Sequence, residues 1–223
     1  MGSSIVLWHT PGSCSRVTMS ALEEIGLEFE DRCVDIFRGE QHSAEFTALN
    51  PKGKVPALLI LQRVHTESAA ILFFLKAQYP TAHLMPAEPK CIPRYQGLED
   101  LVWFSSTIHP MVRQVRNPIR FTEGDTDGVR AHGIKHLTGV FDHIAERLSG
   151  TRWWFGDDWS IHDVYLYWLY STAASGGMDL SFWPALASHA TRVRARPSFV
   201  RSLARENAAL VRHNVVLPPG IKL

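Results

Sequence analysis

The chain has 223 residues, of which 45% are hydrophobic and 20% are charged, so it is long enough for two small globular domains with buried cores. Lysine and arginine number 23 against 22 aspartate and glutamate residues, and this net charge of +1 gives no electrostatic reason to expect nucleic acid as a partner. No stretch approaches the roughly 20 apolar residues that cross a bilayer, and no basic segment leads into a long apolar run at the N-terminus. We therefore expect a cytoplasmic protein that acts on small molecules, without a membrane partner.

The cysteines give no sign of a disulfide framework. Cys14, Cys33 and Cys91 are odd in number, widely spaced and not arranged as C-x-x-C, which also argues against a structural zinc site. A functional cysteine in this chain would therefore act alone.

The first 36 residues predict a strand, a helix and a second strand. Residues 5–9 form a short apolar run that residues 10–12 (Thr-Pro-Gly) stop. Apolar side chains then recur at helical spacing from Val17 to Ile25, and Gly26 ends the pattern. Residues 29–36 read as the second strand, which completes a βαβ unit.

Residues 43–80 predict a helix, two strands and another helix. A short helix covers residues 43–49, and residues 55–61 form an apolar run with Pro56 inside it. Because proline cannot donate to a sheet, this is either an edge strand or a site where Pro56 is cis for a local purpose, and we favour the second interpretation. A short strand at 63–65 follows without an Asp-Gly turn, and a helix then runs from residue 66 to Pro80.

Residues 81–91 have the prolines and polar side chains of a linker, and everything beyond them reads as helix. The expected helices cover residues 92–109, 127–148, 161–174, 183–195 and 197–210. The sequence thus predicts an α/β domain at 1–80 with the order βαβαββα, a linker at 81–91, and an all-α domain at 92–223.

The loop at residues 11–16 is the first candidate for chemistry. Unpaired N–H groups and the positive dipole of a helix start stabilise a thiolate, so Cys14 is a candidate nucleophile. The hydroxyl groups of Ser13 and Ser15 could instead donate to the thiolate of a bound ligand. A purely structural interpretation, with Ser13 as the helix cap and Cys14 as a small buried residue, is equally open.

The second candidate site combines residues 54–57 with residues 66–68. If Pro56 is cis, the backbone N–H and C=O of Val55 point out of the sheet and can pair with an extended peptide. Ser68 at a helix start can take a carboxylate, and Glu67 can pair with an α-ammonium group. Glu67 and Ser68 can also be explained as a helix cap with an acidic first turn.

Three segments together resemble the cytosolic glutathione transferases, in the same order and at the expected separations. They are residues 10–15 (Thr-Pro-Gly-Ser-Cys-Ser), 50–58 (Asn-Pro-Lys-Gly-Lys-Val-Pro-Ala-Leu) and 66–71 (Thr-Glu-Ser-Ala-Ala-Ile). The resemblance extends to the linker, the helical second domain and residues 159–163, where Ser160 and Asp163 look like a capping box.

This resemblance implies a thioredoxin-like first domain that binds glutathione as co-substrate. The backbone of Val55 would hold the cysteinyl part of glutathione beside a cis Pro56, and Glu67 and Ser68 would hold its γ-glutamyl end. Gln41 and Lys54 would lie near the other end of the ligand. A homodimer with a role in detoxification is also implied.

The resemblance leaves the catalytic group open. The loop is most similar to that of the bacterial beta class, where the residue matching Cys14 is a cysteine. Delta-like and theta-like members use a serine, which would match Ser13 or Ser15. His109 resembles a beta-class histidine that faces the thiol, although a buried structural histidine is an equal alternative.

The function we expect is transfer of glutathione to a hydrophobic or aromatic electrophile. A glutathione-dependent thiol-disulfide oxidoreductase or deglutathionylase using Cys14 is one alternative. A non-catalytic binding protein of the same fold is the other.

His132 and His136 have the spacing of two metal ligands, but no suitable third ligand is evident, so we expect no metal.

Overall fold

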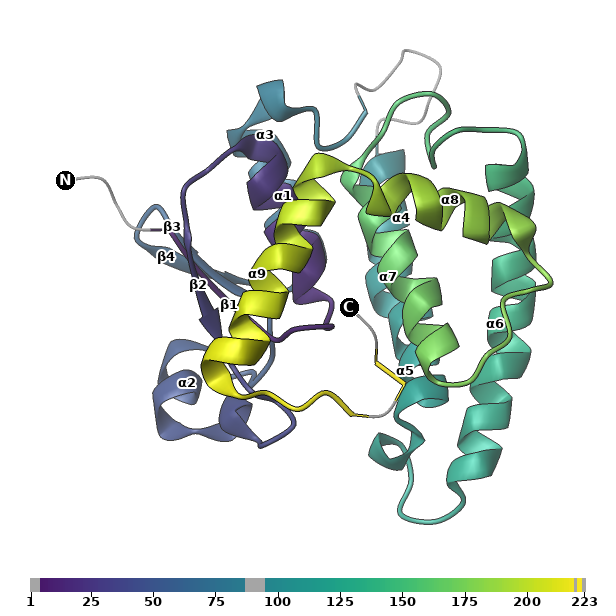
Figure 1. Cartoon of the computed structure of the whole chain (residues 1–223), viewed down its shortest axis with the longest axis horizontal. Coiled ribbons are helices and arrows are strands. Elements are labelled where there is room, and N and C mark those ends of the chain that lie inside the picture. Colours follow the sequence, from purple (N-terminus) through teal and green to yellow (C-terminus); the bar gives the residue numbers. More distant parts are fainter. Residues whose placement is uncertain (1–4, 87–94, 219, 222–223) are drawn as a thin grey trace. The chain divides into compact units, whose positions relative to one another are not determined.

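The computed structural model describes residues 5–86, 95–218 and 220–221 (Figure 1). It divides into two compact units, residues 1–84 with 196–223, and residues 85–195. The last helix therefore belongs to the same compact unit as the first 84 residues. The sequence pattern instead predicts a place for it in the all-α domain at 92–223. The end of the expected linker, with Cys91, and the expected helix start at Ile92 lie outside the described residues.

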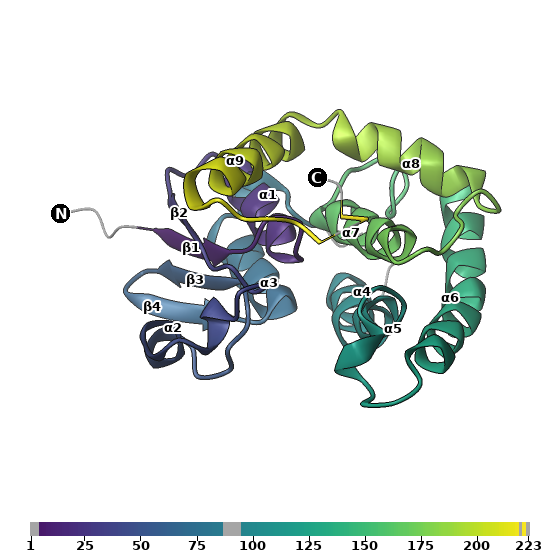
Figure 2. The ribbon, with the colours of Figure 1, turned by 60° about the horizontal axis from the view of Figure 1, so that its bottom comes forward.

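The first unit contains a four-stranded mixed sheet. Its strands are β1 (Val6–His9), β2 (Glu30–Cys33), β3 (Ala57–Ile60) and β4 (Arg63–Thr66), in the spatial order β2-β1-β3-β4. β1 and β2 are parallel, and the other two pairings are antiparallel. With the helices α1 (Ser15–Ile25), α2 (Ala44–Leu49) and α3 (Ser68–Gln78), this confirms the predicted order βαβαββα (Figure 2).

Both faces of this sheet are covered by helices. Phe46 of α2 packs with Val34 and Ala57, and Trp8 and Val64 lie against the same cluster. Successive side chains of a strand point to opposite faces, so the neighbouring Leu7 and Leu58, both fully buried, belong to the other face. There α1 contacts β1, α3 contacts β4, and the two helices contact each other.

Several predicted boundaries follow from local chemistry and are confirmed. Gly26 adopts a left-handed conformation with φ of 79° and caps α1 by donating its N–H to the carbonyl of Leu22. Ser43 caps α2 by accepting the N–H of Phe46 at 3.2 Å. The peptide bond between Val55 and Pro56 is cis, as predicted. The strand itself is shorter than the predicted 55–61, since β3 covers Ala57–Ile60.

The second strand is shorter than the predicted 29–36. It ends at Cys33 because the Asp35 carboxylate accepts the N–H groups of Phe37 at 2.9 Å and Arg38 at 3.3 Å. The Asp35 side chain therefore satisfies backbone N–H groups in a turn, where a longer strand would have paired them with its neighbour.

The hairpin between β3 and β4 has a two-residue turn made of Leu61 and Gln62, with Ile60 paired to Arg63. Both turn residues have positive φ, 50° and 62°, as a type I′ turn requires. The sequence lacks the Asn-Gly or Asp-Gly signal of that turn, but the turn forms with ordinary side chains.

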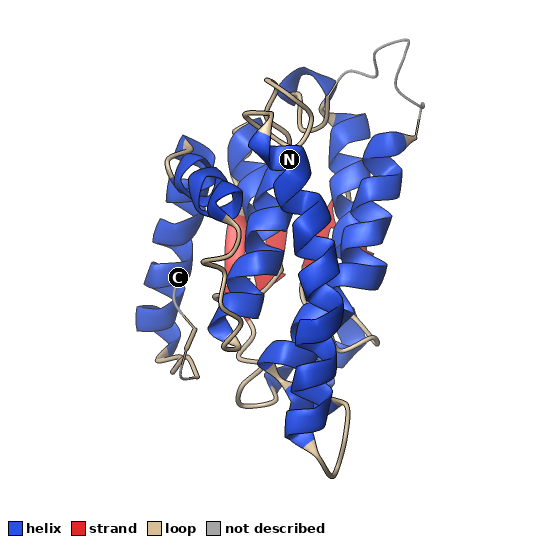
Figure 3. Ribbon diagram, turned by 90° about the vertical axis from the view of Figure 1, so that its right-hand side faces the viewer, coloured by secondary structure: helices blue, strands red, loops and turns tan. Residues whose placement is uncertain are grey.

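The second unit is helical (Figure 3). Its helices are α4 (Gln96–Trp103), η3 (Phe104–Ile108), α5 (His109–Arg116), η4 (Pro118–Arg120), α6 (Thr126–Ser149), α7 (Ile161–Ser175) and α8 (Pro184–Arg194). Apart from isolated bridges at residues 153–158, its described part contains no strand. No helix among the described residues of the chain has the length and apolar composition to cross a bilayer.

The predicted helix end at residue 109 is wrong, because the helical backbone continues past Pro110 to Arg116. Pro110 has no N–H to donate and its ring crowds the carbonyl one turn earlier, which would normally break a helix. Here the preceding turn, Phe104–Ile108, widens into a π-helix. The wider turn accommodates the proline and lets the chain continue.

α7 is the central helix of this unit and is buried along most of its length. The predicted capping box is confirmed, since the Asp163 carboxylate accepts the N–H of Ser160 at 2.9 Å. The same carboxylate accepts the N–H of Trp154 at 2.8 Å and lies 2.9 Å from Nε2 of His189. His189 Nδ1 in turn lies 3.0 Å from the hydroxyl of Tyr170.

The last helix, α9 (Pro197–His213), lies along α1 (Figures 1 and 2). Arginines on or just before α9 pair with acidic residues of α1 and β2. The pairs are Arg196 with Glu24, Arg201 and Arg205 with Glu23, and Arg205 and Arg212 with Asp31. These ion pairs and the buried contact between Ser20 and Ser202 hold α9 on the first unit.

Candidate functional site

The loop between β1 and α1 brings a thiol to a helix start. Gly12 adopts a left-handed φ of 76°, and the chain then turns so that Cys14 becomes the N-cap of α1. The amide of Ser13 closes this turn by donating to the carbonyl of Thr10 at 3.1 Å. As the N-cap, Cys14 lies at the positive end of the helix dipole. The residue is only 7% exposed, so its thiol is largely out of water.

The Cys14 thiol also meets the segment that precedes β3. Its Sγ lies 3.8 Å from the carbonyl oxygen of Val55. Two candidate residues separated by 41 positions in the sequence thus come together, one from each of the predicted sites.

Ser13 and Ser15 form a hydroxyl pair beside the thiol. Their Oγ atoms are 2.5 Å apart, and both lie within hydrogen-bonding distance of the Thr10 carbonyl. Ser15 is fully buried and also accepts the N–H of Thr10, whereas Ser13 is partly exposed. If Ser15 donates to Ser13, the Ser13 hydroxyl donates its proton to the Thr10 carbonyl at 2.8 Å and must turn away from it to reach another acceptor.

Glu67 and Ser68 lie at the start of α3. Glu67 is exposed, and it adopts an unusual backbone conformation with φ of 69° and ψ of 116°. Ser68 follows as the first helical residue and is buried. Non-glycine residues held in such a conformation cluster at ligand sites, which supports a functional interpretation of Glu67.

Lys52 is a functional candidate that the sequence analysis missed. Its ammonium group lies 2.8 Å from the carboxylate of Glu67 and 3.0 Å from the hydroxyl of Thr66. Lys54, which the resemblance favoured, is exposed, and its carbonyl accepts from the Asn50 side chain at 2.7 Å. The two lysines are two residues apart, and the sequence alone could not tell which one reaches Glu67.

Gln41 lies in the short helix η1 (Glu40–His42) and is 6% exposed. Its side-chain Oε1 is buried with no hydrogen-bond partner among the described residues. A buried acceptor without a donor is costly in a folded protein and suggests a site that a ligand completes.

His109 is the first residue of α5, directly after the π-helical turn. Its Nδ1 lies 3.1 Å from the hydroxyl of Tyr165, and its ring centroid is 4.5 Å from that of Trp168. These contacts are all within the helical unit. A role for His109 at the Cys14 thiol stays a prediction.

The other cysteine in the described chain differs from Cys14. Burial, and then the neighbouring carboxylates of Asp35 and Glu40, raise the pKa of the Cys33 thiol to about 12. Cys33 is therefore a neutral, weakly nucleophilic thiol near pH 7.

The two histidines of α6 that have metal-ligand spacing lie against each other. His132 and His136 contact each other through their Nε2 atoms at 3.1 Å, and His132 Nδ1 contacts Gln114. Among the described residues, no group of three or more metal-ligating side chains comes together.

Comparison with known proteins identifies the family. Residues 3–77 match the family model described as the glutathione S-transferase N-terminal domain. The chain is 33% identical over 184 residues to the maleylacetoacetate isomerase of Pseudomonas aeruginosa, covering 80% of this chain and 85% of that protein. It is 38% identical over 178 residues to a zeta-class glutathione S-transferase of Euphorbia esula, covering 78% of each chain.

Solved structures agree with these relatives. A sphingomonad glutathione S-transferase complexed with glutathione is 30% identical, has a TM-score of 0.79, and is matched over 91% of this chain and 98% of its own. The sheet order, the cis proline and the helical second unit described above fit this similarity. On this combination of a matching N-terminal domain and relatives above 30% identity over most of its length, the chain belongs to the glutathione S-transferase family.

Proposed function

We propose that this protein binds glutathione in its first unit and uses the thiolate formed there to attack an electrophilic carbon of a small second substrate. The observation that carries the proposal is the 3.8 Å approach of the Cys14 Sγ to the Val55 carbonyl. An extended peptide that pairs with the Val55 backbone would have its cysteinyl residue beside the start of α1. The positive end of that helix favours a thiolate.

The ends of glutathione have matching partners in this proposal. The exposed Glu67 carboxylate attracts the α-ammonium group, and the Ser68 hydroxyl and the N–H groups at the start of α3 donate to the neighbouring carboxylate. At the other end of the peptide, the Gln41 Oε1 atom can accept the glycyl N–H, and the exposed Lys54 cation can pair with the glycine carboxylate. Each of these groups complements a group that glutathione possesses.

Two residues compete for the role of activating group. Cys14 stands at the helix start. Ser13 is partly exposed beside it, and its hydroxyl could turn from the Thr10 carbonyl to donate to the sulfur of a bound ligand. Ser15 is fully buried, which favours a supporting role behind Ser13. We assign the primary role to Cys14 and the secondary one to Ser13.

The relatives favour a second, closely related activity. One of them is named as a maleylacetoacetate isomerase, and its similarity covers 80% of this chain. A thiolate that adds to an activated double bond can leave again after rotation about the resulting single bond, which isomerises the substrate without consuming glutathione. Conjugation and isomerisation share the addition step and differ in whether the adduct is released.

Two cationic side chains, Arg113 and Arg116, lie in the last turn of α5, and both are partly buried. Burial, and the neighbouring Arg113, lower the pKa of Arg116 to about 10. A partly buried guanidinium gains from an anionic ligand that offsets its charge. We therefore propose a hydrophobic or aromatic electrophile that also carries a carboxylate.

Calorimetric titration of glutathione into the native protein and into Glu67→Ala tests the binding proposal. We expect saturable binding by the native protein and a loss of at least tenfold in affinity for the variant. No binding to the native protein at millimolar glutathione would refute the proposed function.

The activity is then identified with three substrates, the Cys14→Ser variant, and the same variant with Ser13→Ala added. An aryl halide reports conjugation, a cis-configured unsaturated keto acid reports isomerisation, and a glutathione mixed disulfide reports thiol-disulfide exchange. In that exchange the Cys14 thiolate attacks the mixed disulfide and releases the other thiol. A second glutathione then regenerates Cys14 and leaves as glutathione disulfide. Cys14→Ser should abolish the exchange, and any conjugation that survives should require Ser13.

A further inference from the structure

A buried carboxylate on α9 reaches the loop that holds Cys14. Glu206 is fully buried, and its Oε1 accepts the backbone N–H of Gly12 at 3.1 Å. Its Oε2 accepts from Nε of Arg16 at 2.7 Å. Nη2 of Arg16 lies 2.6 Å from the same oxygen as an ion-pair contact, but it is not aligned for a hydrogen bond.

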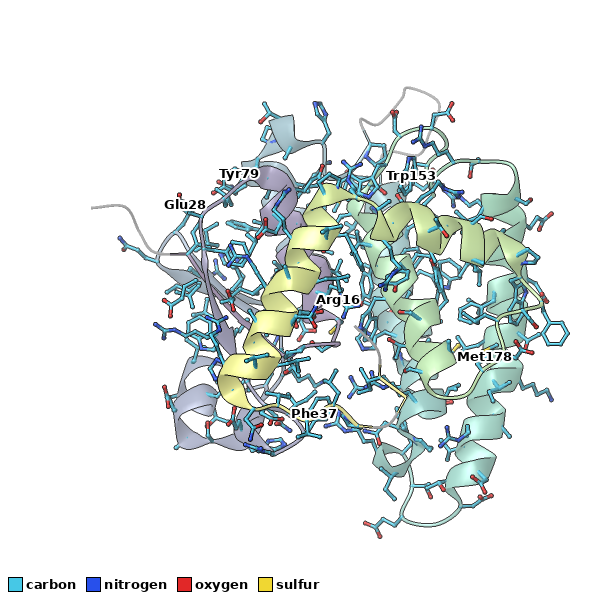
Figure 4. All side chains as sticks on the ribbon, viewed as in Figure 1. Arg16, Glu28, Phe37, Tyr79, Trp153 and Met178 are labelled. Carbon is cyan, nitrogen blue, oxygen red and sulfur yellow. The ribbon has the colours of Figure 1, made fainter. Side chains whose placement is uncertain are left out.

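This contact reverses the charge pattern of the surrounding interface. Elsewhere arginines at α9 pair with acidic residues of α1 and β2, and those arginine side chains are 27% to 54% exposed. In the pair of Arg16 with Glu206 the acid is on α9, and the side chains are only 3% and 0% exposed. Figure 4 labels Arg16 among the side chains. Because burying two charges costs desolvation, such a pair is poor at stabilising a fold. Its presence suggests a specific role.

The position of each partner indicates that role. Arg16 lies in the first turn of α1, where the helix dipole is already positive, and its guanidinium also lies 5.7 Å from the ring of Phe199. Gly12 holds a left-handed conformation two residues before Cys14, at most about 7 Å away along the chain. Glu206 therefore neutralises the cation behind the thiol and fixes the backbone that leads to it.

We propose that Glu206 is a positioning residue for the Cys14 loop, acting through Gly12 and Arg16. It rests on the proposed function in that Cys14 must be reactive. A carboxylate 190 residues away in the sequence then keeps the thiol at the Val55 carbonyl, where the ligand would pair. The last helix thus becomes part of the catalytic unit without touching the substrate.

The test compares two double variants in a background with Cys33→Ala and Cys91→Ser. Arg16→Met with Glu206→Gln removes both charges but leaves an acceptor for the Gly12 N–H. Arg16→Met with Glu206→Leu removes the acceptor as well. The measurements are the alkylation of Cys14 by iodoacetamide across pH, glutathione affinity by calorimetry, kcat with glutathione and whichever of the three substrates above the parent protein turns over, and the melting temperature.

We expect the Leu variant to differ from the Gln variant by at least fivefold in the alkylation rate of Cys14, with a shifted pH profile. Its kcat with glutathione should fall about tenfold, since small misplacements of a reacting group cost that much or more. The melting temperatures of the two variants should stay within a few degrees. Glu24→Gln, which disturbs the ion pair with Arg196 in the same interface, should leave the Cys14 profile unchanged.

Three outcomes overturn the inference. If both double variants bind glutathione and show the Cys14 pH profile of the parent, Glu206 is only part of the helix contact. If the double variants do not fold, Glu206→Asp, which keeps the charge but shortens its reach, must change the profile instead, and an unchanged profile refutes the role. If Cys14 of the parent protein is unreactive and glutathione does not bind, the proposed function has failed and this inference falls with it.

Discussion

The ammonium group of Lys52 lies 2.8 Å from the carboxylate of Glu67, the residue we propose as the partner of the glutathione α-ammonium group. Both side chains are more than half exposed. Glu67 also adopts a left-handed φ of 69°, so its backbone conformation is fixed by its surroundings and not by the ion pair alone. The lysine is therefore a neighbour that an incoming ammonium group must displace or share.

Replacing Lys52 should change glutathione affinity much less than replacing Glu67. An exposed ion pair contributes up to about 1 kcal/mol, which corresponds to a factor of about five. We expect Lys52→Met to change the Kd of glutathione by less than that factor and Glu67→Gln to raise it at least tenfold, measured by calorimetry at constant salt. A loss in Lys52→Met as large as that in Glu67→Gln would instead make Lys52 a direct ligand of glutathione.

The turn between β3 and β4 offers a stabilising substitution. Leu61 and Gln62 both have positive φ, which costs an ordinary side chain about 1 kcal/mol or more and costs glycine little. Leu61 is 57% exposed, so little buried contact is lost on replacing it. Leu61→Asn with Gln62→Gly should raise the melting temperature by about 2–4 °C. Asn with Gly is the pair that a type I′ turn prefers.

The control for this turn is a pair of residues whose second member cannot adopt a positive φ. Leu61→Gly with Gln62→Pro removes a conformation with positive φ at the second position, because proline fixes φ near −65°. It should lower the melting temperature. A gain from this pair equal to that of Asn with Gly would mean that the turn is not type I′.

Sequence reasoning succeeded where one short segment decides the structure. Gly26 and Ser43 cap the helices next to them, and the capping box joins Ser160 to Asp163, three residues later. Each of these interactions is local, so the sequence pattern could predict it. The family motifs likewise located Cys14 and Val55, which the structure brings within 3.8 Å.

It failed where the decisive partner is distant or the signal is missing. Glu206 contacts Arg16, which is 190 residues away in the sequence, and no local sequence pattern predicts that contact. Pro110 predicts a helix end, but the π-helical turn before it accommodates the proline and the helix continues. The turn at Leu61 lacks the glycine that would have revealed it.

Acid should weaken the attachment of α9 to β2, because Asp31 of β2 pairs with two arginines of α9. The neighbouring His9, 3.6 Å away as an ion-pair contact, lowers the pKa of the Asp31 carboxyl most; burial opposes this, and Arg205 and Arg212 lower it further. A folded pKa below the unfolded value of about 3.9 contributes stability that is fully present above that pH. The contribution is lost as the pH falls below about 4 toward the folded pKa.

Thermal unfolding of Asp31→Asn across pH tests this linkage. We expect the variant to melt below the native protein at pH 6–7 and the two melting temperatures to converge below pH 4. Glu30→Gln, which removes an exposed partner of Arg32, should leave the melting temperature unchanged. A constant difference between Asp31→Asn and the native protein from pH 7 to pH 3 would contradict the electrostatic explanation.

The helical unit should depend most strongly on Asp163. Its carboxylate is fully buried and accepts hydrogen bonds from the amides of Trp154 and Ser160 while contacting His189. Asp163→Ala leaves these buried groups without their acceptor, and we expect it to lower the free energy of unfolding by about 3–5 kcal/mol. Urea unfolding followed by tryptophan fluorescence measures the loss.

Asp125→Ala is the matched control, because Asp125 also accepts two amide N–H groups at a helix start. Those amides belong to Asp127 and Gly128 at the exposed start of α6, so water can replace the lost carboxylate there. The expected cost is about 1 kcal/mol. Equal losses in the two variants would mean that Asp163 is only a helix cap. A several-fold larger loss in Asp163→Ala would mean that burial makes the same type of cap a requirement for folding of the helical unit.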